Sequence, residues 1–273
     1  VNLKNIKLLI LDEADHMLDL GFINDIRMLI KYLPKYRQTL FFSATIDEEI
    51  KNLAYSLVSK PVRIEISPKD PVSKHVDHYV SYVEMDDKRF FLERLIRENP
   101  EDKMLVFVRT KVRAERLKKA MERVGISCET FRGDKTQQER NTVMDDFRKG
   151  TVKVLIATDV SARGIDIPNI EMVVNYDLPE QAENYVHRVG RTGRGDKFGK
   201  SISFCSIGEK NLLKEIESFI TKPITELVVD KQTYKETIKM TADPTQEKLT
   251  SLIDEIEKID ELARKKAKSK KRK

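Results

Sequence analysis

Two adjacent carboxylates, Asp12 and Glu13, follow a short apolar run at residues 7–11, and Asp15 comes two positions later. An apolar run of this length is typical of a buried parallel strand, so the carboxylates are expected at its carboxyl end. Carboxylate oxygens are ligands that Mg²⁺ prefers, and a neighbouring carboxylate can position a water molecule for attack on a phosphate. The same residues would also suit an acidic helix N-terminus, where carboxylates are stabilised by the helix dipole.

Two small hydroxyl residues, Ser43 and Thr45, follow a second apolar run at residues 39–42. Their hydroxyls would hydrogen-bond Asp15 and pass its state to another surface, or they would cap the next helix in the ordinary way. Taken alone, this short segment favours the capping role.

A ten-residue pattern from Ala157 to Asp166 follows an apolar run at residues 153–156. Thr158 stands at a strand-to-helix junction, where a hydroxyl can donate to a phosphate. Gly164 permits a sharp backbone turn, and Asp166 is suited to accept a hydrogen bond from a ribose hydroxyl. A pattern of this length favours a nucleotide or phosphate site over an ordinary turn.

Three arginines, Arg188, Arg191 and Arg194, recur at every third position with glycines between them. Guanidinium groups make bidentate contacts with phosphate oxygens, and an arginine that reaches a transferring phosphate stabilises the charge of phosphoryl transfer. The alternative is a solvated basic loop. The helix expected at residues 182–189 would direct this loop toward a sheet end, which favours the phosphate role.

Alternating strands and helices must position these groups. The first part of the chain predicts strands at residues 7–11, 39–42 and 62–66 and helices at 23–33 and 47–57. Two prolines within residues 67–71 predict a linker. Beyond it, strands are predicted at 76–83, 103–108, 127–131, 152–156, 170–175 and 200–206, and helices at 86–98, 110–124, 136–148, 181–189 and 208–220. This alternation is typical of an α/β fold with mostly parallel sheets, whose chemistry gathers at the carboxyl ends of the strands.

Taken in order, Asp12–Asp15, Ser43–Thr45, Ala157–Asp166 and His187–Arg194 resemble the motifs of the DEAD-box ATP-dependent RNA helicases, over about residues 1–225. Residues 211–217, with the basic tail, look most like the bacterial RhlE-like subgroup. The resemblance implies RecA-like parallel sheets flanked by helices, with ATP and RNA bound across the cleft between two domains. The expected organisation is the C-terminal part of a first RecA-like domain at 1–66, a linker at 67–74, a complete second domain at 75–225 and an extension at 226–273.

The resemblance also implies residue roles for ATP and Mg²⁺. Asp12 would hold Mg²⁺, and Glu13 would position the hydrolytic water. Asp166, with Gly164 shaping its turn, would contact the ribose, and Arg191 and Arg194 would reach the γ-phosphate, with Arg194 as the arginine finger. A relay between the ATP and RNA states, together with a link between the domains, would use Asp15, Ser43, Thr45, Arg163 and His187.

RNA contacts are implied in the same way. Phe107–Thr110 matches the family's fourth motif, and Arg132–Lys135 followed by Gln137 and Arg140 matches its next backbone-binding stretch. Such contacts bind phosphates and read no sequence. The alternative for Gln137 and Arg140 is a solvated helix face. The expected RNA-binding residues are Thr110, Gly133, Lys135, Gln137, Arg140 and Thr158.

The family's glycine-rich phosphate loop is missing from this sequence. Gly195–Ser201 resembles that loop, but it has three residues between its glycines where four are needed, and it precedes an expected strand. The sequence therefore predicts part of an RNA helicase that does not hydrolyse ATP by itself. The alternative is a non-catalytic RNA-binding or annealing module.

Composition and cysteine content exclude several classes of protein. The chain has 273 residues, of which 40% are hydrophobic and 35% charged, so a wholly disordered or fibrous protein is excluded. No apolar run approaches the roughly 20 residues of a membrane span. The only cysteines, Cys128 and Cys205, lie far apart in the sequence, which argues against a disulfide scaffold and favours the reducing cytoplasm.

The net charge of +6 comes from the end of the chain. Residues 264–273 hold eight basic residues, and the other residues hold 43 basic against 45 acidic ones. We expect this tail to tether RNA by counterion release, the alternative being a solvated tail that aids solubility. The apolar seam at residues 249–263 predicts a helix that packs on its own domain or on a protein partner, within a monomeric protein.

Overall fold

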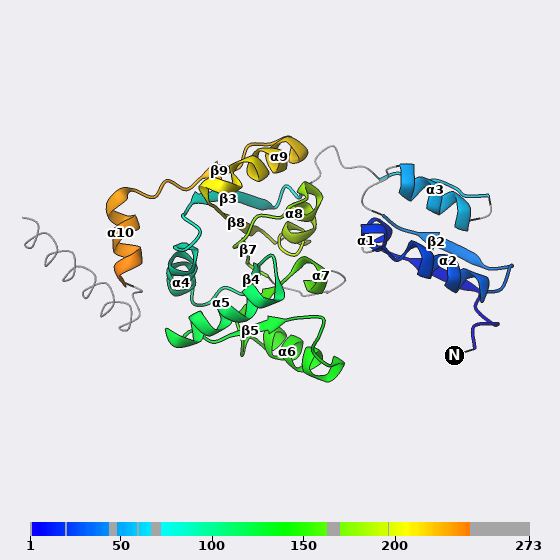
Figure 1. Ribbon diagram of the computed structural model, residues 1–273, viewed down its shortest axis with the longest axis horizontal. Helices are drawn as coiled ribbons and strands as arrows, with labels where there is room; N and C mark the ends of the chain where they lie inside the picture. Colours follow the sequence, from blue (N-terminus) through cyan, green and yellow to red (C-terminus); the bar gives the residue numbers. More distant parts are fainter. Residues whose placement is uncertain are drawn as a thin grey trace, which may run out of the picture. The chain divides into compact units, whose positions relative to one another are not determined.

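The computed structural model describes residues 2–19, 21–43, 48–58, 60–66, 72–162, 170–195 and 197–240. The chain divides into two compact units, Val1–Ser67 and Pro68–Lys273. In each unit, helices pack against a parallel sheet (Figure 1). None of the helices within the described ranges is long and apolar enough to cross a membrane.

Among its described residues, the first unit has a two-stranded sheet. Strand β1 (Leu8–Leu11) pairs in parallel with β2 (Gln38–Phe41), so that Leu11 lies opposite Phe41. The helices of this unit are α1 (Ala14–Asp19), α2 (Ile23–Lys31) and α3 (Glu48–Leu57). Its core is small and centres on Leu11, Ile26 and Leu53.

The prediction of a strand at residues 62–66 is wrong. Residues 61–66 have no regular secondary structure, and Val62, Ile64 and Ile66 are 86%, 79% and 90% exposed. Alternating apolar residues form a strand only where a neighbouring strand supplies hydrogen-bond partners and a covered face. No strand within the described part of the chain pairs with this segment.

The second unit has a seven-stranded parallel sheet with the order β5-β6-β4-β7-β8-β3-β9 among the described residues. The strands are β3 (Val76–Tyr82), β4 (Met104–Phe107), β5 (Cys128–Phe131), β6 (Val154–Ala157), β7 (Met172–Asn175), β8 (Gly199–Cys205) and β9 (Thr225–Glu226). The helices are α4 (Lys88–Glu98), α5 (Lys111–Arg123), α6 (Gln137–Lys149), α7 (Asp159–Ala162), α8 (Ala182–Val189), α9 (Lys210–Ile220), α10 (Lys231–Met240) and the short 3₁₀ turn η1 (Ile207–Glu209).

Helices cover both faces of this sheet. On one face, α4, α5 and α10 pack on alternate strand residues such as Val106 and Val174. On the other face, α6 and α7 pack on the intervening residues, such as Leu105 and Val173, and α8 and α9 pack on β3 and β8. A sheet that is buried on both faces needs apolar residues at every position, which explains why β4, β6 and β7 read as continuous apolar runs.

The six strands and five helices predicted for residues 76–220 are confirmed to within about two residues at each end, the normal uncertainty of such limits. The unit also continues past the expected limit at residue 225. The Tyr234 hydroxyl on α10 donates to the Asp87 carboxylate at 2.8 Å, and its ring lies 4.9 Å from that of Phe91 on α4. The helix predicted at residues 249–263 and the basic tail lie outside the described residues.

Candidate functional site

In the first unit, Asp12, Asp15 and Ser43 follow the strands of the sheet at one edge. Asp12 follows the last residue of β1, and Ser43 comes two residues after the end of β2. Backbone hydrogen bonds join these ends, from Phe42 N–H to the Leu11 carbonyl (2.8 Å) and from Ala14 N–H to the Phe42 carbonyl (3.0 Å). The parallel register therefore brings the two segments together, as the strand pattern predicts.

The turn after β1 has an unusual backbone. Glu13 has φ = 51°, in the left-handed region that side chains other than glycine rarely adopt. The Asp12 carboxylate accepts a hydrogen bond from the Glu13 N–H at 2.9 Å, which stabilises the turn. Asp12 remains exposed while Asp15 is buried. Such conformations cost on the order of 1–3 kcal/mol and cluster at functional sites.

This edge fits a hydrated Mg²⁺ better than an ion enclosed by protein ligands. No group of three or more His, Cys, Asp or Glu residues in the described part of the chain could hold a metal ion. Mg²⁺ usually keeps several waters and is held by one or two carboxylates together with substrate phosphates. The exposed carboxylate of Asp12 matches that kind of donor set. Thr45 lies outside the described residues.

In the second unit, Arg188 does not join the basic loop, although it begins the series of three arginines. Its side chain is 2% exposed and forms a bidentate ion pair with Asp159, with N–O distances of 2.6 and 2.8 Å. The same guanidinium donates to the Asn175 amide oxygen (3.1 Å) and the Asp177 carbonyl (2.7 Å). It also lies over the Phe107 ring, 5.0 Å from its centroid. Arg188 thus fixes α8 against α7 and the sheet.

The other two arginines lie at the end of α8. Arg191 and His187 line a shallow pocket with Phe107, Asp159, Ala162 and Arg188. The Arg191 Nε donates to the His187 carbonyl at 3.3 Å, and the Arg194 Nε donates to the Gly190 carbonyl at 2.8 Å. Both acceptors are carbonyl groups at the carboxyl end of α8, where the helix itself supplies no donor. The guanidinium group of arginine carries five N–H donors, a geometry that suits phosphate oxygens.

Gly193 lets this loop pass close to β3. Its φ is +62°, and a Cβ built on it would lie 2.4 Å from the Val76 Cγ2 and 3.0 Å from the His75 carbonyl oxygen. Gly195 has the same φ, but a Cβ there would meet nothing within 4 Å. Gly193 is therefore required both by its positive φ and by the lack of room for a side chain. Gly195 is required by its positive φ alone.

The predicted RNA contacts lie at the carboxyl ends of three neighbouring strands. Thr110 follows β4 and caps α5 by accepting from the Arg113 N–H at 3.2 Å. Gly133 and Lys135 follow β5, before Gln137 opens α6. Strands β5, β6 and β4 are adjacent and parallel, so their carboxyl ends form one edge. The structure thus brings these residues to one side of the unit.

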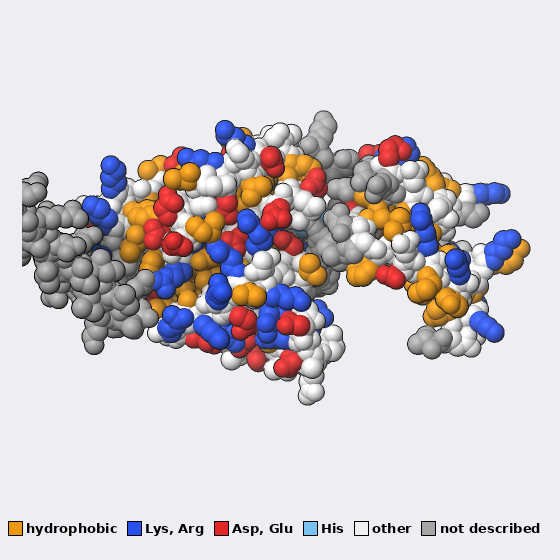
Figure 2. Space-filling view, in the orientation of Figure 1, with side chains coloured by type: hydrophobic (Ala, Val, Ile, Leu, Met, Phe, Trp, Pro, Cys, Tyr) orange, Lys and Arg blue, Asp and Glu red, His pale blue; other side chains and the backbone are white. Residues whose placement is uncertain are grey.

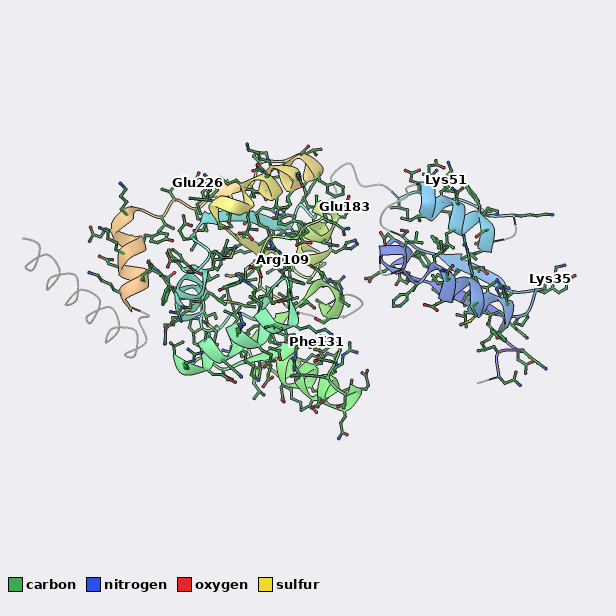
Figure 3. All side chains as sticks on the ribbon, in the orientation of Figure 1. Lys35, Lys51, Arg109, Phe131, Glu183 and Glu226 are labelled. Carbon is green, nitrogen blue, oxygen red and sulfur yellow. The ribbon has the colours of Figure 1, made fainter. Side chains whose placement is uncertain are left out.

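Several of these side chains already have partners within the unit. Lys135 lies 3.5 Å from the Glu129 carboxylate, and Gln137 donates to Asn141 at 2.9 Å. The Arg140 guanidinium lies 4.8 Å from the centroid of the Phe131 ring, which is labelled in Figure 3. Because Gln137 is exposed and Arg140 is partly exposed, both remain accessible at the start of α6.

Thr158 is less accessible than its predicted role suggests. It is 6% exposed, its N–H donates to the Ser161 hydroxyl at 3.0 Å, and the two hydroxyls lie 3.1 Å apart. The Thr158 carbonyl accepts from the N–H groups of Ser161 and Ala162, so Thr158 is bonded within the first turn of the short helix α7. Arg163, Gly164 and Asp166 lie outside the described residues, so their predicted roles stay predictions.

A buried ionic network that the sequence analysis missed supports the start of α5. Lys88 has no exposed surface, and its ammonium group donates to the Glu209 carboxylate at 2.5 Å and lies 4.0 Å from Asp177. Asp177 in turn accepts from the Arg109 N–H at 3.0 Å and pairs with Arg113 at 2.7 Å. Burial lowers the pKa of Lys88 against the opposing effect of Glu209. Burial would raise the pKa of Glu209, but the hydrogen bond and charge of Lys88 lower it overall.

One sequence signal could have identified Asp159, the partner of the buried Arg188. Asp159 lies within the ten-residue pattern that begins at Ala157, and an acidic residue there could have been paired with an arginine of the later basic segment. Lys88 stands in a polar stretch with nothing to mark its burial. Its partners come from 89 and 121 positions later in the chain.

Comparison with known proteins agrees with this geometry. Residues 1–53 match the model of the DEAD/DEAH box helicase family, and residues 87–196 match the helicase conserved C-terminal domain. ATP-dependent RNA helicase DbpA of Bacillus subtilis is 41% identical over 219 residues, which are 80% of this chain and 46% of that protein. ATP-dependent RNA helicase RhlB of Shewanella frigidimarina is 42% identical over 226 residues, covering 82% of this chain and 52% of that one. The chain thus spans about half the length of these curated relatives.

Solved structures agree as well. S. cerevisiae Dbp5 bound to RNA and ADP BeF3 has a TM-score of 0.77 and 33% identity, over 88% of this chain and 64% of that chain. The E. coli DEAD-box protein SrmB, bound to regulator of ribonuclease activity A, is 35% identical with a TM-score of 0.53, over 58% of this chain and 94% of that chain. The RhlE-like subgroup stays a prediction. The matched motifs, the parallel sheets and these relatives show that this chain belongs to the DEAD-box helicase family.

Proposed function

We propose that this chain is part of an ATP-dependent RNA helicase, which couples ATP binding and hydrolysis to local unwinding of RNA or remodelling of RNA–protein complexes. Its relatives DbpA and RhlB carry the name ATP-dependent RNA helicase, which supports the proposal. The chain also holds the carboxylates and the arginines that such a reaction needs, in two separate units.

The first unit would contribute the groups that handle the metal and water. Asp12 would hold Mg²⁺, and Glu13, placed by the strained turn beside it, would orient the attacking water. When bound, Mg²⁺ neutralises charge on the β- and γ-phosphate oxygens of ATP. Asp15 and Ser43 would link this edge to the RNA-binding state.

The second unit would contribute the RNA grip and the cations for the γ-phosphate. Arg191 and Arg194 carry fork-shaped guanidinium groups, whose geometry suits phosphate oxygens. Thr110, Gly133, Lys135, Gln137 and Arg140 would contact the RNA backbone. Contacts to phosphates give affinity that is independent of sequence and depends on salt.

One observation carries the proposal for RNA: the predicted RNA contacts, though far apart in the chain, share the carboxyl edge of β4 and β5. To test it, we would measure binding of a short labelled single-stranded RNA to the 273-residue chain by fluorescence anisotropy over a range of salt concentrations. Arg140→Gln should weaken binding and reduce the logarithmic salt slope by about 0.7, the value for one phosphate contact on a single strand.

The matched control is Lys214→Gln, which removes an exposed cation from α9. It should leave affinity and slope unchanged. Equal effects of the two substitutions would show that the carboxyl edge is not the RNA site.

The second candidate function is a non-catalytic RNA-binding or annealing module, and the missing phosphate-loop motif favours it for this polypeptide. ATP hydrolysis by the chain, with and without RNA, decides between the two. Turnover that RNA stimulates and that Glu13→Gln and Arg191→Ala abolish would show that this chain is itself an ATPase. RNA binding without turnover would assign the chain the binding role.

A protein partner, a monomeric state and a cytoplasmic location remain part of this proposal. Sedimentation of the chain at several concentrations would test the monomeric state. A mass that rises with concentration would contradict it.

A further inference from the structure

A shallow groove lies between α4 and α5 of the second unit. Its floor is lined by four apolar residues. Phe90 and Met121 are only 7% and 2% exposed, and Ala120 and Val124 beside them are half-buried. The remaining lining residues are Arg89, Glu93 and Arg123. An apolar floor with a charged rim is typical of a site that receives an amphipathic helix.

A row of cations borders this groove. Arg116, Lys119 and Arg123 follow one another at intervals of three and four residues on α5, so they lie on one face of the helix. All three are exposed, and none makes a hydrogen bond or ion pair with another described residue. Lys118, on the same helix, is instead paired with Glu129 at 2.8 Å. Figure 2 shows Lys and Arg side chains gathered over α5.

The chain contains a segment whose chemistry complements this groove. Residues 245–263 hold six carboxylates and two lysines, a net charge of −4. Leu249, Leu252, Ile256 and Ile259 recur at intervals of three and four, the spacing of one face of a helix. The segment therefore pairs an apolar stripe with negative charge, where the groove pairs an apolar floor with unpaired positive charge.

The segment is also tethered close to the groove. Helix α10 ends at Met240, and one turn earlier Thr237 accepts a hydrogen bond from Arg94 at 2.7 Å. Arg94 is the neighbour of Glu93, which lines the groove. The residues between Met240 and Leu249 can span roughly 26 Å when extended. Because α10 packs on α4, which forms one wall of the groove, a tether of this length permits docking.

We propose that residues 245–263 of this chain form an amphipathic helix that docks in the α4–α5 groove. Its apolar stripe would pack on the half-buried Ala120 and Val124, and its carboxylates would pair with Arg116, Lys119 and Arg123. The occupant is thus a part of the same chain, and the groove is an intramolecular docking site.

RNA is the competing occupant, since a row of cations also attracts phosphates. The groove is less suited to RNA because its floor is aliphatic and aromatic, a surface that complements the apolar stripe of the segment and not a phosphate. The two occupants give different results in the experiment that follows.

The first test is disulfide trapping in the full 273-residue chain. Ala120→Cys with Ile256→Cys joins the groove to the segment, and Glu122→Cys with Ile256→Cys, which uses an exposed position on α5 outside the groove lining, is the control pair. The native thiols interfere little, because burial raises the pKa of Cys128 to about 12 and that of Cys205 to about 11.

Both pairs share one tether, so a segment that only moves freely would cross-link at similar rates in both. We expect the groove pair to form its intramolecular disulfide about tenfold faster than the control pair, because docking raises the local thiol concentration above that of the tether alone. High salt should reduce the difference, since exposed ion pairs are screened. Equal rates, or disulfide-linked dimers whose yield rises with protein concentration, would overturn the proposal.

The second test separates the segment from RNA. Lys119→Glu should slow disulfide formation in the groove pair, while Lys214→Glu, on α9, should not. Circular dichroism would confirm that each variant is folded. If Lys119→Glu weakens binding of the labelled single-stranded RNA and leaves the cross-linking rate unchanged, the cation row is an RNA surface and the docking proposal is wrong.

Discussion

Replacement of Arg188 by alanine tests whether the buried ion pair with Asp159 holds α8 in place. The side chain of Arg188 is 2% exposed and that of Asp159 is 26% exposed. Alanine would remove both bonds to Asp159 and the donors to Asn175 and Asp177. The partly buried carboxylate of Asp159 would then lose the guanidinium with which it pairs.

The expected cost follows from that burial. Removing one partner of a buried ion pair typically costs about 3–5 kcal/mol, because the other charge is left uncompensated. Water can reach about a quarter of the Asp159 side chain, so we expect the lower part of this range, about 3–4 kcal/mol. For a domain of this size, that loss corresponds to a fall in Tm of about 6–16 °C.

The assay is urea and thermal denaturation followed by circular dichroism, since the chain contains no tryptophan. The transition of the second unit gives the free energy of unfolding. Arg188→Lys keeps the charge but not the fork geometry, so its free energy of unfolding should lie between those of the alanine variant and the native protein. Arg194→Ala, on the exposed part of the same motif, should change the free energy by no more than about 0.5 kcal/mol. A loss below about 1 kcal/mol for Arg188→Ala would refute the reasoning.

Three further predictions concern the second unit. Gly193→Ala should destabilise it by at least about 2 kcal/mol more than Gly195→Ala. Both substitutions strain the backbone, but only the Cβ at position 193 meets neighbouring atoms. Equal losses of the free energy of unfolding in urea denaturation would contradict this. Burial lowers the pKa of His78 from 6.5 to about 4, so its contribution to stability is complete above pH 6.5 and is lost as the pH falls toward 4. The loss is up to about 3 kcal/mol, and His78→Phe should remove that slope from a pH series of denaturation curves. Lys88→Met should cost about 3–5 kcal/mol, and adding Glu209→Gln should restore part of it, because the second change removes a buried carboxylate that has lost its nearest cation. Additive losses in a double-mutant cycle would exclude the coupling.

Much of the candidate site follows from local sequence. The apolar runs before Asp12, Ser43 and Thr158 predict three strands, and each is present within about two residues of its expected limits. Parallel strands end at a common edge, so placing a motif after a strand also places it at that edge. Thr158 lies at that edge with its hydroxyl 3.1 Å from that of Ser161, and its phosphate contact stays a prediction.

Other features depend on contacts between distant segments. The pattern at residues 62–66 predicts a strand as well as the pattern at 39–42 does, but only the latter has a neighbouring strand to pair with. Helix α10 has no motif that predicts its place, and it is located by Tyr234, whose partner Asp87 lies 147 positions earlier.

The sequence by itself determined the order of strands and helices, the family motifs and the strand ends at which they lie, because apolar periodicity and turn residues act over a few positions. Only the tertiary structure decided which charges are buried. Arg188 and Arg194 look alike in the sequence, yet one is enclosed with an aspartate 29 positions away and the other is exposed. The free energy of a charge depends on the water and partners around it, and those are supplied by segments that the folded chain brings together.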